Sequence, residues 1–197
     1  VGSEMCIRDR FEAVVKNLPS GVHKLSVLVD NSFSEASALH VENDYQSYGG
    51  ISRGVMIEQL PKHYIKQLHF TPVCKDDTWY AQLELVIASL DGKPWKGKVS
   101  VSLKGCDDVN ENVLYTQSCS TGAGELVLKS DLIACENAKP WAPEHPTLYM
   151  LSAQLEDEDG KVIDDLTDRV GFREVRTQGK DILLNLSLIH ISEPTRH

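Results

Sequence analysis

The segment TWYAQLELVIASLDG, residues 78–92, decides the fold of this chain. Apolar and polar side chains alternate along it, and an extended backbone places every second side chain on the same face. The residues that share the apolar face are Trp79, Ala81, Leu83, Leu85 and Ile87. Asp91-Gly92 then supplies residues typical of a turn. The segment therefore predicts a long strand with one buried face.

Similar strand patterns continue on both sides of this segment. No stretch of ten or more residues shows a convincing helical period of 3.6 residues. Further strands are expected at residues 24–29, 55–60, from 64 onward, 99–103, 125–128, 148–155, 161–164 and 169–173. A hairpin turn is expected at Asp159-Gly160. This spacing is typical of β-sandwiches, so the sequence predicts an all-β protein.

The composition excludes some classes of partner. The chain has 197 residues, with 29 Asp and Glu against 20 Lys and Arg, and a formal net charge of −9. An acidic surface disfavours nucleic acid, whose phosphates attract basic surfaces. No apolar run approaches the roughly 18 residues of a membrane-spanning helix. We therefore expect neither nucleic acid nor a membrane as a partner, and the compartment, cytoplasmic or periplasmic, is not indicated.

Residue spacing disfavours a metal site. Cys74, Cys106, Cys119 and Cys135 include no Cys-x-x-Cys pair, so a zinc site is not expected. The acidic run at 156–159 lacks the loop pattern of a dedicated calcium site. We predict no metal ligands in this chain.

The two ends of the chain differ from the rest. One DNA encoding of LSLIHISEPT, near the C-terminus, has a reverse complement that translates as VGSEMCIRD, which is the sequence of residues 1–9. Two natural termini are not expected to be antisense to each other. Residues 1–10 and 186–197 therefore resemble translated sequencing adapter, and we exclude them from fold reasoning.

A boundary between two modules is expected near Pro61, where a strand-like segment meets a Pro-Lys-His connector. Residues 61–175 are close in length to an immunoglobulin-like β-sandwich. Residues 11–60 are short for a sandwich and are expected to be the C-terminal part of a larger domain. Residues 176–185 are expected to begin a linker.

Several motifs in both modules follow a known order. They are LSVLVDN (25–31), NDYQSYGGISRGVMI (43–57), PKHYI (61–65), WAPEHPTLYML (141–151), Asp164, RVGFREV (169–175) and ILLN (182–185). Together they resemble family 2 of the glycoside hydrolases, which includes β-galactosidases, β-glucuronidases and β-mannosidases. The resemblance implies a partial jelly-roll sugar-binding domain, then an immunoglobulin-like sandwich, then a catalytic (β/α)8 barrel that this chain does not include.

The resemblance also implies where the chemistry is done. Retaining hydrolysis needs an acid and a nucleophilic carboxylate about 5 Å apart, and both belong to the family's barrel. We therefore expect no catalytic residue in this segment, which should be inactive alone. Asn110-Glu111 looks like the family's Asn-Glu pair, but its acidic neighbours favour a solvated loop.

Asp44 is the predicted substrate-binding residue. It matches an aspartate that related enzymes extend from the first domain into the sugar pocket, where it accepts hydrogen bonds from substrate hydroxyls. The alternative is that Asp44 only stabilises its loop. In some galactosidases the matching aspartate also helps to hold sodium. We expect no cofactor here, and a sodium or magnesium ion only in a full-length enzyme with further ligands outside this segment.

Other motif residues are expected to have structural roles. Arg53 and Arg173 should bridge backbone carbonyls or carboxylates between domains. Trp141 should fill such a seam rather than form a platform for a sugar.

The predicted function is that of a non-catalytic fragment of an exo-glycosidase acting on terminal β-glucuronides or β-galactosides. The YGGI segment, followed by Arg53 and PKHYI, slightly favours a β-glucuronidase. A carbohydrate substrate and a homo-oligomeric full-length protein are the expected partners. The alternative from another class is a two-sandwich carbohydrate-binding or adhesion protein without catalysis.

Overall fold

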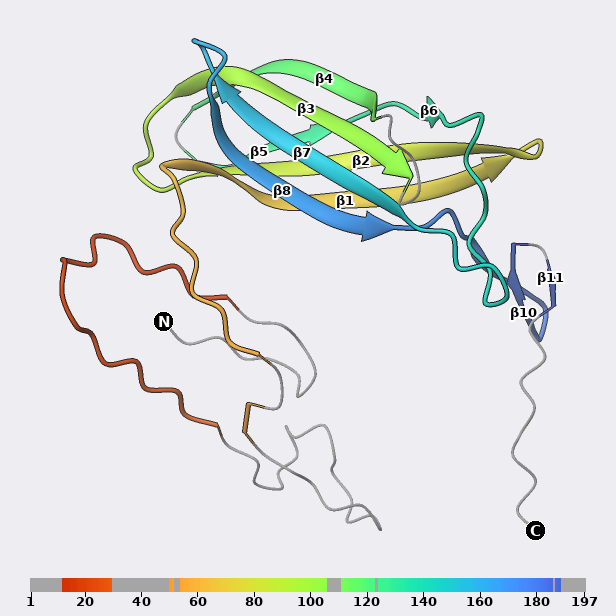
Figure 1. Cartoon of the computed structure of the whole chain (residues 1–197), viewed down its shortest axis with the longest axis horizontal. Coiled ribbons are helices and arrows are strands. Elements are labelled where there is room, and N and C mark those ends of the chain that lie inside the picture. The colour runs from red at the N-terminus through yellow and green to blue at the C-terminus, as the bar shows by residue number, and fades with distance from the viewer. Residues whose placement is uncertain are drawn as a thin grey trace. The chain divides into compact units, whose positions relative to one another are not determined.

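The computed structural model describes residues 12–29, 50–51, 54–105, 111–122, 124–185 and 187–188 (Figure 1). The chain divides into two compact units, Val1–Gln59 and Leu60–His197, which are described separately. The described residues contain strands and no helix, which confirms the all-β prediction. No helix among them is long and apolar enough to cross a membrane.

The described part of the first unit, residues 12–29, 50–51 and 54–59, contains no strand. The strands predicted at 24–29 and 55–60 are therefore wrong. Leu25 and Val27 are 72% and 46% exposed. Alternation marks a segment that can form a strand, but a strand also needs a neighbour that pairs its N–H and C=O groups. The partial jelly roll over 11–60 and the domain limits stay predictions.

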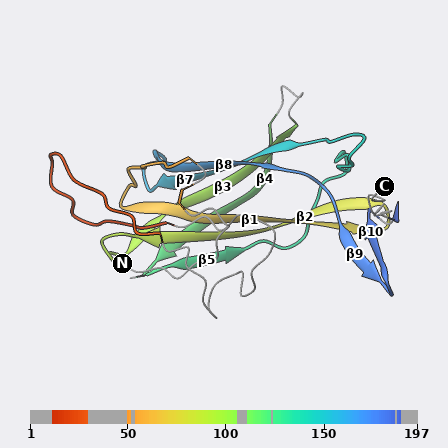
Figure 2. The same ribbon diagram turned by 90° about the horizontal axis from the view of Figure 1, so that it is seen from below.

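The second unit is a two-layer β-sandwich. One sheet has the order β1-β2-β5, with β6 also paired to β2, and the other has the order β4-β3-β7-β8. Figures 1 and 2 show the two layers. The strands of the first sheet are β1 (His63–Lys75), β2 (Thr78–Ser89), β5 (Leu126–Lys129) and β6 (Ile133–Ala134). Those of the second are β3 (Trp95–Gly105), β4 (Asn112–Thr121), β7 (Tyr149–Asp157) and β8 (Val162–Val170).

The core lies between the inner faces of the two sheets. Leu83, Leu85 and Ile87 of β2 are fully buried against residues of the facing sheet such as Val99 and Leu151. This confirms the predicted inner face of β2. The inner-face residues are buried because they face the other sheet, and Val86 and Ala88 on the opposite face of β2 are buried as well.

Two details of the strand prediction differ from the structure. β8 is one continuous strand, where two short strands at 161–164 and 169–173 were predicted. β4 was not predicted, since its sequence NVLYTQSCST is mainly polar and its inner residues are only partly buried. The Asp159-Gly160 turn is confirmed, with Gly160 at φ 76°.

Side chains complete the backbone pairing where the strands are irregular. Asp164 of β8 accepts a hydrogen bond of 2.7 Å from the Ile65 N–H of β1, beside the bulge between Ile65 and Gln67. Asp164 therefore links the adjacent edges of the two sheets. This gives a structural role to a residue of the predicted family pattern.

Ser130 fills the gap between β5 and β6 on β2. Its backbone N–H donates to the Leu83 carbonyl at 2.9 Å, and its hydroxyl oxygen accepts a hydrogen bond from the Leu83 N–H at 2.9 Å.

We expect Ser130→Ala to lower the free energy of unfolding by about 2 kcal/mol, because the buried Leu83 N–H is left unpaired. Urea unfolding would measure the loss. Ser130→Thr keeps the hydroxyl and serves as the control. An alanine variant as stable as the threonine variant would contradict this role.

A small antiparallel sheet follows the sandwich. It consists of β9 (Val175–Gln178), β10 (Asp181–Leu184) and β11 (Ser187–Leu188), in the order β11-β10-β9. The residues expected to begin a linker, 176–185, thus include most of a β-hairpin. The connection between this hairpin and the sandwich contains several of the motif residues.

Candidate functional site

The motif residues of the second unit meet at one end of the sandwich. The segment after β8 runs beside the segment before β7, with a parallel bridge between Pro140 and Phe172. The Trp141 N–H donates to the Phe172 carbonyl at 2.8 Å. Phe172 itself is fully buried. The two motifs WAPEHPTLYML and RVGFREV are therefore joined through their backbones.

Asn185 ties the hairpin to this junction. Its side-chain amide donates to the Trp141 carbonyl at 2.8 Å, and its Oδ1 accepts the Glu174 N–H at 2.9 Å. The Asn185 N–H donates in turn to the Glu174 carbonyl at 2.9 Å. Asn185 has a φ of 50°, in the left-handed region that asparagine tolerates better than most residues. One side chain thus connects three segments, which we call the Asn185 clamp: Trp141, Glu174 and Asn185.

We expect Asn185→Ala to destabilise the second unit by about 2 kcal/mol, because the Glu174 N–H and the Trp141 carbonyl both lose their partner. The exchange of the Glu174 amide proton with solvent should speed up by at least the fold-change in the unfolding equilibrium that corresponds to this loss of free energy. Hydrogen exchange and urea unfolding would measure both effects. Asn185→Gly is the control for backbone strain, since glycine tolerates the positive φ but lacks the amide. Unchanged exchange at Glu174 in both variants would contradict the clamp.

Arg173 and Trp141 contact each other next to the clamp. The Arg173 guanidinium carbon lies 5.2 Å from the centroid of the Trp141 ring, a cation–π arrangement. A side chain at Gly171 would meet the Trp141 Cβ at 3.2 Å, so the ring packs closely on the backbone there. Trp141 is partly buried by these contacts. Its role at a seam between domains stays a prediction. The structure shows the Trp141 ring as the partner of Arg173, whereas backbone carbonyls or carboxylates were predicted as its partners.

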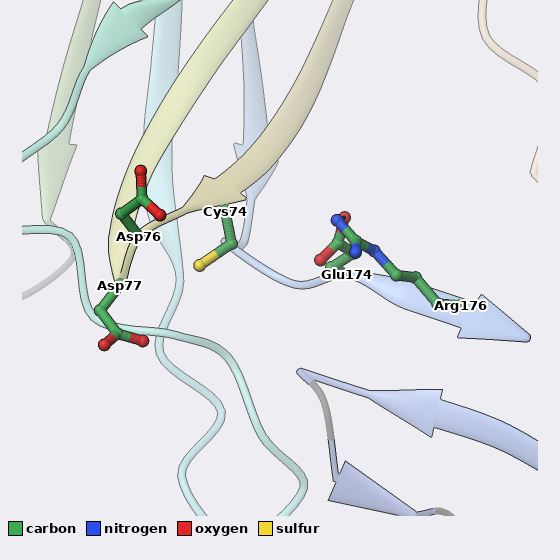
Figure 3. Close-up of a pocket in the computed structure, with 5 residues that line it drawn as sticks. All are labelled: Cys74, Asp76, Asp77, Glu174 and Arg176. Atoms are coloured by element: carbon green, nitrogen blue, oxygen red, sulfur yellow. Dashed lines mark ion pairs between the residues drawn. The ribbon is translucent and has the colours of Figure 1, made fainter. Parts of the chain in front are cut away.

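A shallow pocket lies beside this junction. It has a volume of about 260 Å³ and is lined by Cys74, Asp76, Asp77, Glu174 and Arg176 (Figure 3). Asp76 and Asp77 form the turn between β1 and β2, with φ values of 48° and 59°. These values suit the two-residue hairpin turn, although Asn-Gly is its preferred sequence.

Two of the charged side chains of this pocket form an ion pair with each other. The Arg176 Nη2 lies 2.6 Å from the Glu174 Oε1. Within the described part of the chain, no group of three or more His, Cys, Asp or Glu side chains is placed to hold a metal ion. The Glu174 carboxylate is thus occupied by an intramolecular ion pair, and the pocket offers mainly the Asp76 and Asp77 carboxylates.

The thiols of Cys119 and Cys135 are not activated nucleophiles. Burial raises the pKa of the Cys119 thiol and of the Cys135 thiol. At Cys135 a hydrogen bond with the backbone of Ala81 partly opposes this rise in the pKa. A thiol with a raised pKa carries less of the reactive thiolate at neutral pH. These cysteines therefore have a packing role.

The remaining predicted residues fall into two groups. Asp44, Arg53 and Asn110 lie outside the described residues. Glu111 is exposed, directly precedes β4 and is hydrogen-bonded to Ser102, which is a solvated position. In the acidic run, Asp157 accepts the N–H groups of Asp159 and Lys161 at 3.1 and 2.9 Å and so stabilises the hairpin turn.

The order of these motifs and the sandwich that they join can be compared with known proteins. The model of the glycosyl hydrolases family 2 matches residues 63–173. The chain belongs to this family. The match begins with β1 and ends at Arg173, so it covers the whole sandwich and the bridge between Pro140 and Phe172, and it stops before Glu174 and Asn185 of the clamp.

Individual family 2 proteins show how much of the chain is shared. A β-galacturonidase from Eisenbergiella tayi, in a crystal structure with bound galacturonate, is 45% identical with a TM-score of 0.68, over 80% of this chain and 27% of that one. A putative β-glucuronidase from Formosa agariphila is 28% identical over 81% of this chain and 19% of its own length. The β-galactosidase BgaC from Bifidobacterium adolescentis is 27% identical over 91% of this chain and 17% of its own length.

The chain thus spans about a quarter or less of these relatives. The family 2 resemblance noted in the sequence is confirmed. The sequence patterns did not predict the Asn185 clamp, although Asn185 is the last residue of the ILLN motif. Its partners lie 11 and 44 positions away along the chain, and no local pattern marks such a contact.

Proposed function

We propose that this chain is the β-sandwich part of a retaining family 2 glycosidase that removes terminal β-linked uronic acids from carbohydrates. The observation that carries the proposal is the 45% identity to a β-galacturonidase over 80% of the chain. The similarity to a putative β-glucuronidase supports the same substrate class. The similarity to a β-galactosidase, at 27% identity, is lower than that to the β-galacturonidase.

The proposed role of this chain within such an enzyme is structural. Retaining hydrolysis requires two carboxyl groups about 5 Å apart, one as acid and one as nucleophile. Near the junction, Glu174 is paired with Arg176 and Asp164 is hydrogen-bonded to the Ile65 N–H. In the family pattern both catalytic carboxylates belong to the barrel, so we infer that they lie in a part of the longer protein outside this chain. The Asn185 clamp then sets the direction in which the chain leaves the sandwich.

The substrate class can be tested with the longer protein that contains this sequence. The protein would be assayed on 4-nitrophenyl β-galacturonide, β-glucuronide and β-galactoside. We expect kcat/KM for one of the uronides to exceed that for the galactoside by about 100-fold or more, since a site built to bind a charged group rejects the analogue without it. The 197-residue chain alone should hydrolyse none of them.

Two results would contradict the proposal. A galactoside hydrolysed as well as both uronides would rule out the uronide specificity. The absence of turnover on all three sugars, combined with measurable sugar binding, would favour the carbohydrate-binding alternative.

The longer protein is also proposed to form a homo-oligomer, which light scattering of the same preparation would test.

Asp44 is proposed to contact the sugar in this enzyme. The support is the match of NDYQSYGGI to the family pattern. We expect Asp44→Asn to lower kcat/KM by about 10- to 100-fold, because the loss of a hydrogen bond to a charged group costs about 1.5–3 kcal/mol. Glu42→Gln, a neutralised acid two positions away, is the matched control. Equal activity of the two variants would leave Asp44 with a loop role only.

A further inference from the structure

The strand β4 ends its sheet with an open edge. Figure 1 shows β4 as the outermost strand of the layer β4-β3-β7-β8. Among the described residues, β3 is the only strand that pairs with β4. The outward N–H and C=O groups of an edge strand can pair with another chain.

The other edges of the sandwich carry features that prevent such pairing. β1 contains Pro72 and a bulge between Ile65 and Gln67, and it lies next to β8 through the Asp164 bond. β8 carries four charged residues, as its sequence VIDDLTDRV shows. β5 has four residues and ends in a lysine, and β6 has two. Short strands, charges, prolines and bulges all block edge-to-edge association.

β4 lacks most of these features. Its ten residues, NVLYTQSCST, include no charge and no proline. A bulge lies opposite the step from Val101 to Ser102, which leaves Leu114 as the extra residue. From Tyr115 to Thr121 the pairing with β3 is regular. This second half of β4 is therefore a regularly paired, uncharged edge.

The side chains on this edge suit a second copy of the same strand. Thr116, Ser118 and Ser120 are exposed and share the outer face. On the inner face, Tyr115 and Cys119 pack against the core. If two β4 strands pair antiparallel about a two-fold axis at Ser118, Thr116 of each copy lies opposite Ser120 of the other. Hydroxyl pairs of this kind stabilise neighbouring strands.

We propose that residues 115–121 of β4 pair with the same residues of a second copy, which joins the two β4-β3-β7-β8 sheets into one continuous sheet. A two-fold contact places identical residues near each other, so like charges oppose it. The chain has a net charge of −9, and the uncharged β4 edge avoids this repulsion. Lys96 and Lys98 of β3 lie one strand back from the edge, opposite Ser120 and Ser118, and Lys98 is paired with Glu156 at 2.8 Å.

The oligomeric state of three forms of the full chain tests this proposal. Size-exclusion chromatography with light scattering would compare the unchanged chain, Ser118→Lys and Gln154→Lys over a series of concentrations. Ser118→Lys places a charge at the two-fold axis. Gln154→Lys adds the same charge on the same face of the sheet, at an exposed site on the inner strand β7. Circular dichroism would check that both variants keep their strands.

We expect the unchanged chain and Gln154→Lys to have twice the chain mass of 21.9 kDa, and Ser118→Lys to have the single mass. Should Ser118→Lys fail to fold, Ser120→Lys tests the same edge. A chain that stays monomeric at all concentrations would overturn the proposal. So would dimers that persist in the folded edge variants, since another surface would then hold the copies together. Neither result depends on glycosidase activity.

Discussion

Replacement of Phe172 by alanine should lower the free energy of unfolding of the second unit by about 3–5 kcal/mol. Phe172 is fully buried. Its ring makes edge-on contacts with Phe70, Trp79 and Tyr149, at centroid distances of 5.2, 5.8 and 5.2 Å. The change removes these contacts and leaves a cavity that the strands of two sheets cannot easily close. The loss should therefore be near the upper end for a core residue.

The effect should extend from stability to the junction. The Phe172 carbonyl accepts the Trp141 N–H at 2.8 Å, so the buried ring holds the backbone to which Arg173 and Glu174 belong. Urea unfolding followed by tryptophan fluorescence would measure the loss of stability. Hydrogen exchange at Trp141 would report the local effect.

Val175→Ala is the control for Phe172. Val175 lies three positions later and is 60% exposed, so its truncation should change stability by less than about 0.5 kcal/mol. Phe172→Leu, which keeps part of the volume, should fall between the two. A loss below about 1 kcal/mol for Phe172→Ala would show that the ring is not the anchor of the junction.

Gly97→Ala should destabilise the sandwich by about 3 kcal/mol, because the added methyl group has no space. A Cβ at this position would overlap the Glu156 carbonyl oxygen on β7 and the ring of Trp95. The ring can shift only by disturbing its stacking on His63, at a centroid distance of 5.8 Å. The carbonyl belongs to the neighbouring strand and is held by the sheet. Glycine at this site therefore permits the close approach of β3, β7 and the indole ring.

Gly122→Ala is the matched control for Gly97, since a Cβ there meets nothing within 4 Å. Thermal and urea unfolding of both variants would measure the difference. In a Trp95→Phe background the cost of Gly97→Ala should fall, because the smaller ring removes one of the two overlaps. Equal stability of the two alanine variants would contradict the packing argument.

The sequence predicted the sandwich well where each strand has one clearly buried face. Along β2, the five residues of the predicted inner face, from Trp79 to Ile87, are all buried. Pattern reasoning failed where burial is partial. β4 was not predicted because the polarity of Gln117 and Cys119, on its inner face, contrasts too little with that of Ser118 between them. In the first unit, Leu25 and Val27 alternate correctly but have no partner strand among the described residues.

The sequence by itself determined the all-β class, the inner face of the main strands and the membership of family 2, because these depend on short-range periodicity and on ordered motifs. The tertiary structure decided which motif residues touch. Asn185 reaches the Trp141 carbonyl 44 positions away, and Asp164 reaches Ile65 across 99 positions. Such contacts depend on the register of the strands and on how two sheets close over one core, which no local pattern encodes.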